Sequence, residues 1–156
     1  RGPQGERIHL ITLCALAHLD FNLIATHSYD QYFATIEALG LGASDREQAF
    51  RRVVFNVMAL NRDDHTKNLA FIRPQDGGWQ LAPAYDLTYA HNPNGRWTAR
   101  HQMSVSGRFD AIGLDDLRAL PGVGDYTAAA VAARQIEQER RRRRGEYQYQ
   151  VVIEKQ

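Results

Sequence analysis

The chain has 156 residues, of which 44% are hydrophobic and 24% are charged. This composition is typical of one folded domain with a small appendage, and it excludes a disordered protein. No run of about 18 apolar residues occurs, which excludes a membrane-spanning helix and a membrane partner. The opening residues lack the basic, apolar and small-residue order of a signal peptide. Because the chain also lacks an initiator Met, we expect it to begin inside a longer protein or after processing.

The net charge of +1 is unevenly distributed. Residues 131–156 hold seven basic and four acidic residues (+3), whereas residues 1–130 hold twelve basic and fourteen acidic residues (−2). Only the tail therefore has the charge for nonspecific DNA binding. The single cysteine, Cys14, excludes an internal disulfide framework and a cysteine-based zinc cluster. Its apolar surroundings indicate a buried, inert thiol, which fits a reducing, cytoplasmic location.

Two helices are predicted in the first forty residues. If residues 9–17 form a helix, apolar side chains cover nearly all of its faces, which indicates a buried helix. Ser28 begins a second helix that runs to Leu39. Gly40 follows it and suits the left-handed conformation that often ends a helix.

A third helix is predicted from Ser44 to about Leu60. Ser44 and Glu47 have the spacing of a capping box, in which each side chain satisfies the free backbone N–H of the other. The apolar residues that follow have the spacing of a core-facing helical stripe. These residues are Ala49, Phe50, Val53, Val54, Val57 and Met58.

A polar segment, residues 61–68 with the sequence NRDDHTKN, separates two strongly apolar stretches. It is followed by a predicted strand at 69–72, a tight turn at 76–78 whose glycines are expected to have positive φ, and a returning strand at 79–82. A hairpin brings its two ends together. We therefore expect the polar segment and Asp86 to lie close in space.

The rest of the chain is less regular. Residues 88–110 are predicted to be a long irregular segment and residues 114–120 a short helix. A tight turn at 120–124 then leads into a long alanine-rich helix at 125–144, and residues 145–156 read as a strand or a frayed tail. The predicted fold is mainly α with a small β-hairpin (α+β) and a helical C-terminal extension.

Three oxygen-bearing side chains, Asp63, Asn68 and Asp86, have the types and order that phosphoryl transfer requires. One carboxylate accepts or orients the proton of the attacking hydroxyl, while an amide oxygen and a second carboxylate hold Mg²⁺ against the nucleotide phosphates. Hard oxygen ligands suit magnesium. The spacing of aspartate, four residues, asparagine, hairpin and aspartate is that of a protein-kinase catalytic loop and its following metal-binding aspartate.

Together with LAPAYDL at residues 81–87, the polar segment resembles the C-terminal lobe of the HipA-like kinases. These are serine/threonine kinase toxins of a bacterial toxin–antitoxin system. The likeness covers roughly residues 5–118 and includes shorter motifs at Gly5–His9, Phe55–Val57 and His101–Arg108. For residues 1–118 it implies a protein-kinase-like C-terminal lobe, mostly helical, with a small β-hairpin.

The resemblance also implies roles for five residues. Asp63 would be the catalytic base. Asn68 and Asp86 would bind the cofactor Mg²⁺ and, through this metal, the cofactor ATP. His65 and Lys67 would shape the loop or touch phosphate. Family members phosphorylate an aminoacyl-tRNA synthetase and are held by a DNA-binding antitoxin, so a protein substrate and such an antitoxin are the implied partners.

Other interpretations of these residues stay open. Taken alone, residues 61–68 would be a solvated turn and Asp86 a helix cap or turn residue; their joint spacing around a hairpin favours a kinase-type site. The other histidines have no paired spacing that suggests a metal, and they are interpreted as structural or surface residues. They are His9, His18, His27, His91 and His101.

A kinase of this type also needs a phosphate-covering glycine-rich loop and a lysine that pairs with the α- and β-phosphates. No lysine precedes Lys67, and the opening residues hold only Gly2 and Gly5. We therefore expect the N-terminal lobe to be absent from this chain, which alone would bind nucleotide weakly and turn over little or not at all.

Residues 117–132 resemble a different structure, the helix–hairpin–helix of adenine-type DNA glycosylases, and residues 119–156 are therefore assigned to a second segment with a basic tail. In that motif Gly122 and Gly124 would let backbone amides approach a DNA phosphate. An arginine run would add salt-sensitive attraction: Arg140, Arg141, Arg142, Arg143 and Arg144. A plain helical hairpin is the alternative. The competing function is a non-enzymatic module that binds DNA phosphates, in which the kinase-like residues are vestigial.

Overall fold

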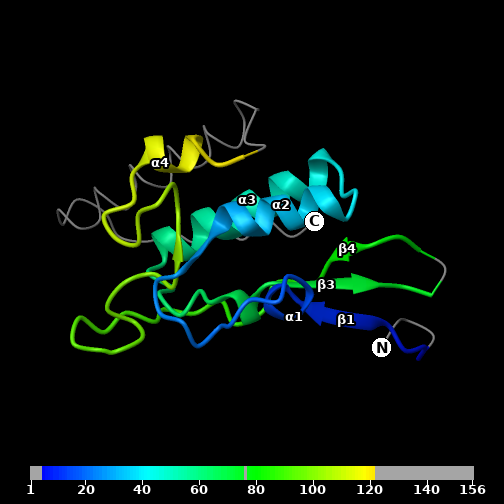
Figure 1. Cartoon of the computed structure of the whole chain (residues 1–156), viewed down its shortest axis with the longest axis horizontal. Coiled ribbons are helices and arrows are strands. Elements are labelled where there is room, and N and C mark those ends of the chain that lie inside the picture. The colour runs from blue at the N-terminus through cyan, green and yellow to red at the C-terminus, as the bar shows by residue number, and fades with distance from the viewer. Residues whose placement is uncertain (1–4, 76, 122–156) are drawn as a thin grey trace, which may run out of the picture.

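The computed structural model of the chain describes residues 5–75 and 77–121. This part combines helices with two small sheets, so its fold is mixed α and β (Figure 1). The elements in chain order are β1 (His9–Thr12), α1 (Leu13–Leu16), β2 (His27–Ser28), α2 (Tyr29–Ala38), α3 (Ala43–Met58), the 3-10 helix η1 (Thr66–Asn68), β3 (Ala70–Arg73), β4 (Gln80–Leu81), β5 (Met103–Ser104) and α4 (Leu114–Arg118).

The larger sheet has the antiparallel strand order β1-β3-β4. The predicted hairpin is confirmed as β3 and β4, which pair Phe71 with Leu81. The predicted helix at 9–17 is wrong in its first half, because β1 pairs along the free edge of β3 and places His9 opposite Arg73. A short apolar run fits a buried strand as well as a buried helix, and only the partner strand decides between them.

The connection between β3 and β4 is longer than the tight turn predicted at 76–78. The strands end at Arg73 and resume at Gln80, and the Gly77 N–H lies 3.4 Å from the Pro74 carbonyl oxygen. Neither Gly77 nor Gly78 has positive φ, so that expectation is wrong. A six-residue connection reverses the chain gradually and does not need the left-handed residues of a tight hairpin turn.

The helix α2 begins and ends as predicted. The Ser28 backbone N–H donates to Gln31 Oε1 at 2.9 Å, which satisfies a free donor at the start of the helix. Gly40 has φ +71°, the left-handed conformation expected after the last turn.

The third helix begins earlier than predicted, at Ala43 instead of Ser44. The residue before it is Gly42, whose backbone N–H donates to Asp45 Oδ2 at 3.3 Å. Glu47 is therefore free of the capping role and forms an ion pair with Arg51 one turn later, at 2.7 Å. The capping-box prediction is wrong because the acidic residue at the third helical position is Asp45.

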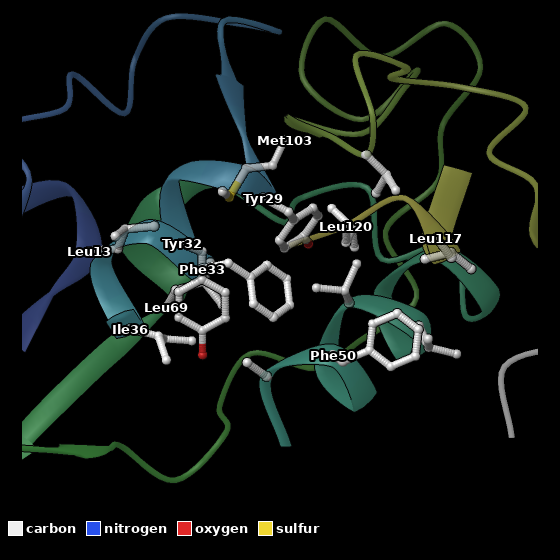
Figure 2. Close-up of a cluster of buried hydrophobic side chains, with 14 of the residues drawn as sticks. Leu13, Tyr29, Tyr32, Phe33, Ile36, Phe50, Leu69, Met103, Leu117 and Leu120 are labelled. Atoms are coloured by element: carbon white, nitrogen blue, oxygen red, sulfur yellow. The ribbon is translucent and has the colours of Figure 1, made fainter. Parts of the chain in front are cut away.

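The core lies between α2, α3 and the segment that follows β5 (Figure 2). Figure 1 shows α2 and α3 side by side, with the strands β1, β3 and β4 along them. The predicted apolar stripe of α3 faces this core, except that Met58 is only partly buried. Leu69 and Phe71, which directly follow the polar segment, are 5% and 0% exposed. Their burial anchors the C-terminal end of that segment.

Residues 88–110 are largely irregular, as predicted, apart from β5, which pairs in parallel with β2. The predicted helix at 114–120 is present as α4. The predictions for residues 122–156 lie outside the described residues. Where the chain is described, no helix is long and apolar enough to cross a membrane. Cys14 is buried, as expected.

Candidate active site

The polar segment 61–68 is not a solvated turn. Asp64 and Thr66 are 2% and 0% exposed, while Asp63 between the buried positions keeps 44% of its side chain exposed. Lys67 is also exposed. The segment therefore has an inner set of side chains that fixes it and an outer set that faces solvent.

Asp64 fixes the segment from inside. Its Oδ2 accepts a hydrogen bond from the Tyr29 hydroxyl at 2.8 Å, and its Oδ1 accepts one from the Gln102 backbone N–H at 2.8 Å. His101 Nδ1 lies 2.9 Å from Oδ2, and a carboxylate only accepts, so Nδ1 carries the proton. Burial and the neighbouring Asp64 raise the pKa of Tyr29 well above its usual value, which keeps its hydroxyl a donor.

Arg62 also holds the polar segment in place, through a different set of partners. It is 9% exposed, and its guanidinium donates to the Ala99 carbonyl oxygen and, at 2.7 Å, to Asp110 Oδ1. A buried guanidinium requires such partners. Arg62 and Asp64 together join residues 61–68 to the irregular segment that follows Asp86.

Asn68 and Asp86 are in direct contact although 18 residues separate them. The Asn68 Nδ2 donates to Asp86 Oδ2 at 2.8 Å and to the Asp63 carbonyl oxygen at 3.0 Å. The juxtaposition expected from the hairpin is therefore present. Both contacts use the amide nitrogen, so Asn68 Oδ1 remains available to another group.

The backbone at Asp86 has φ +55°, a left-handed conformation that is uncommon outside glycine. Asn61 supports it: its Nδ2 donates to the Asp86 carbonyl oxygen at 3.1 Å and to Asn56 Oδ1 at 2.9 Å. Asn61 itself is 2% exposed. The position of the Asp86 carboxylate is thus set by a buried amide at the start of the polar segment.

The remaining predicted residues, His65 and Lys67, lie beside Phe21. The Lys67 ammonium lies 4.6 Å from the centre of the Phe21 ring, and the His65 ring lies 6.0 Å from it. His65 Nε2 is 3.9 Å from Asp63 Oδ1. A cation over an aromatic face is electrostatically attracted to it, so Phe21 holds the exposed ammonium near the loop.

A small pocket opens between these groups and is lined by Arg52, Asn56, Asn61, Asn68, Leu69, Ala84, Tyr85, Asp86 and Leu87. Asn61 is one of these lining residues, and its Oδ1 is buried and has no hydrogen-bond partner in the described part of the chain. Tyr85 closes one side, because its hydroxyl donates to the Lys67 carbonyl oxygen at 2.6 Å. Partial burial raises the pKa of Tyr85.

The oxygen atoms of this pocket fit a hard divalent cation. Asp86 supplies an exposed carboxylate, Asn68 an amide oxygen that its own hydrogen bonds leave available, and Asn61 a buried oxygen with no described partner. Magnesium prefers such oxygen ligands and keeps several waters, so it needs only one or two carboxylates. Among the described residues no three His, Cys, Asp or Glu side chains form a metal cluster.

Sequence reasoning missed the buried residues that position the site: Tyr29, Asn56, Asn61, Asp64 and His101. These residues give only a weak signal in the sequence. A single polar residue in an apolar stretch, such as Asn56 in α3, does not stand at a recognisable sequence separation from the residues that it contacts in the fold. Two predicted groups cannot be placed, since Gly122, Gly124 and the arginines at 140–144 lie outside the described residues.

Comparison with known proteins identifies the family. The family described as the HipA-like C-terminal domain matches residues 1–150. A Sinorhizobium fredii protein named "Putative kinase Y4dM" is 29% identical over 136 residues, which are 84% of this chain and 32% of that protein. The chain therefore spans about a third of the length of this curated relative.

The solved structures agree on the fold. HipA of Shewanella oneidensis MR-1, from its toxin–antitoxin complex with HipB and operator DNA, matches with a TM-score of 0.65 at 17% identity. The match covers 97% of this chain and 42% of that one. The family match runs through residues 117–132, and nothing in these comparisons supports the glycosylase-like interpretation of that segment. The chain belongs to the HipA-like C-terminal domain family.

Proposed function

We propose that this chain is the catalytic lobe of a HipA-like protein kinase that transfers the γ-phosphoryl group of ATP to a serine or threonine of a protein. The contact between Asn68 and Asp86 carries the proposal, because it joins the two proposed metal ligands across 18 residues at 2.8 Å. Membership of the HipA-like family and the kinase name of the Sinorhizobium relative support the same reaction class.

Each residue of the site has a role in this proposal. Asn68 and Asp86 would hold Mg²⁺ through their oxygen atoms, and the bound metal with ATP would supply the activated γ-phosphoryl group. Asp63 accepts the proton of the attacking hydroxyl, and its 44% exposed side chain is open to a protein substrate. Lys67 offers a positive charge to phosphate oxygens, and His65 lies within ion-pair distance of Asp63 and helps to orient it.

The glycine-rich loop and phosphate-binding lysine of a kinase would come from sequence outside this chain, which spans about a third of its curated relative. We likewise propose a DNA-binding antitoxin as partner, because the Shewanella HipA was solved with HipB and operator DNA. The resemblance to the family supports an aminoacyl-tRNA synthetase as the protein substrate.

The test uses the full-length gene product that carries this chain. ATP with Mg²⁺ should raise the melting temperature of the wild type, and Asp86→Ala should abolish this shift because a metal ligand is lost. Asp63→Asn should keep the shift yet lower transfer of labelled γ-phosphate at least about 100-fold, the contribution expected of a general base.

The control is Asp115→Asn, which removes an aspartate whose side chain is 98% exposed. It should leave both the melting shift and the transfer rate unchanged. A wild-type protein without an ATP-dependent shift, or Asp63→Asn with normal transfer, would refute the proposed function.

A further inference from the structure

A continuous line of buried hydrogen bonds runs between the two ends of the candidate site. It begins at Asp64 Oδ2, which accepts from the Tyr29 hydroxyl at 2.8 Å. The Tyr29 oxygen accepts in turn from Asn56 Nδ2 at 3.0 Å. Asn56 Oδ1 accepts from Asn61 Nδ2 at 2.9 Å, and the same nitrogen donates to the Asp86 carbonyl oxygen at 3.1 Å.

Every side chain in this line is withdrawn from water. Tyr29 is 0% exposed, Asn61 and Asp64 are 2% exposed, and Asn56 is 4% exposed. Hydrogen bonds in such surroundings are electrostatically stronger than at the surface, and a missing partner is costly. The geometry of the line is therefore maintained once the protein is folded.

Tyr29 is the junction of the line. Its hydroxyl donates to one arm, which ends at Asp64 next to Asp63, and accepts from the other arm, which ends at the main chain of Asp86. A phenol oxygen can do both at once, whereas a phenylalanine ring can do neither. Removing this one atom would separate the two arms and leave the packing of the ring unchanged.

We infer that Tyr29 is a positioning residue for the proposed phosphoryl transfer: through Asp64 and through Asn56 and Asn61, its hydroxyl keeps the segment that carries Asp63 at a set distance from Asp86. This inference rests on the proposed function. A misplacement of about 1 Å at such a site costs up to about 100-fold in rate.

The helix α2 contains its own control for this inference. Tyr32 is also 0% exposed and lies one turn further along. Its buried hydroxyl takes no part in this line, and the charged group that acts most on it is Arg52. Tyr29→Phe and Tyr32→Phe therefore remove the same atom from the same helix, but only the first interrupts the line between Asp64 and Asp86.

The experiment measures kcat, the KM for ATP and the Mg²⁺ concentration at half-maximal rate, in the full-length gene product and at a temperature at which circular dichroism shows each variant folded. Tyr29→Phe should lower kcat about 10- to 100-fold, as expected for misplaced reacting groups. It should also raise the Mg²⁺ midpoint several-fold and change KM little. Tyr32→Phe should stay within about twofold of the wild type.

A merely structural role for Tyr29 would lower the melting temperature without lowering the kcat of the folded protein, and that result would overturn the inference. Equal kcat values for Tyr29→Phe and Tyr32→Phe would also overturn the inference. In either case, phosphoryl transfer by the wild type that depends on Asp63 would leave the proposed function intact. If the wild type shows no Asp63-dependent transfer, the inference and the proposed function are both refuted. Should Tyr29→Phe fail to fold, Asn56→Ser interrupts the same line, and wild-type kinetics in that variant would refute the inference.

Discussion

At the scale of single residues, the neighbours Asp63 and Asp64 show how different surroundings give two identical side chains different roles. Asp63 faces solvent, whereas Asp64 is 2% exposed and receives hydrogen bonds from Tyr29 and the Gln102 backbone. An exposed carboxylate is free to exchange protons with a substrate, while a buried one with fixed donors is structural. Asp64 therefore contributes to stability, whereas Asp63 has the exposure that its proposed catalytic role requires.

This difference gives a stability prediction. Asp64→Asn should lower the free energy of unfolding by about 1–3 kcal/mol, because the new amide group replaces an acceptor oxygen and leaves buried donors unsatisfied. Asp63→Asn should change it by less than about 0.5 kcal/mol, as is usual for a surface substitution. Urea denaturation of both variants measures the two effects, and equal losses would contradict the assignment of Asp64 as the inner support.

At the scale of elements, backbone conformation at the ends of helices matters as much as the side chains inside them. Gly40 ends α2 with φ +71°, and a Cβ atom built there would meet nothing within 4 Å. Any cost of a side chain at this position therefore comes from the left-handed backbone and not from a clash.

Gly40→Ala should accordingly lower the free energy of unfolding by about 1–2 kcal/mol, the cost of the left-handed conformation for a residue with Cβ. Gly78 is the matched control, because its Cβ would also have open space and its φ is not positive. Gly78→Ala should be neutral or stabilising by up to about 1 kcal/mol through a less flexible unfolded chain. Thermal unfolding of the two variants compares these effects, and an equal loss in both would show that the backbone explanation is wrong.

At the scale of the whole molecule, two buried phenols limit the pH range of the fold. Tyr29 and Tyr32 are both 0% exposed, and burial raises the pKa of Tyr32 from 10.0 to about 12 and that of Tyr29 well above its usual value. The neutral phenols are therefore favoured in the folded state. Unfolded chains lose these protons from about pH 10 upward, as ordinary tyrosine does.

The sign of the pH effect follows from linkage. A pKa raised on folding stabilises the protein fully below the unfolded value, and this contribution is lost as the pH rises towards the folded value. The free energy of unfolding should thus fall between about pH 10 and the Tyr32 pKa of about 12. Tyr32→Phe should flatten part of this decline in urea denaturation series at several pH values, whereas an unchanged slope would show that Tyr32 does not contribute.

Sequence alone predicted the features that depend on local pattern. The extent of α2, the hairpin of β3 and β4, and the approach of Asn68 to Asp86 all follow from apolar spacing and from the short return of a hairpin. The family was also accessible, because NRDDHTKN and LAPAYDL occur together at the spacing of a kinase loop. The prediction of a mainly α fold missed the second sheet, which joins β2 to β5.

Only the tertiary structure decided the features that depend on distant partners. β1 forms a strand because β3 offers it a free edge, and Asp64 is buried because Tyr29 and His101, 35 and 37 residues away, supply its donors. A polar residue has no preference for the interior by itself; it is buried only where folding brings complementary groups to it. The sequence determined which side chains form the candidate site, and long-range hydrogen bonding decided how they are held.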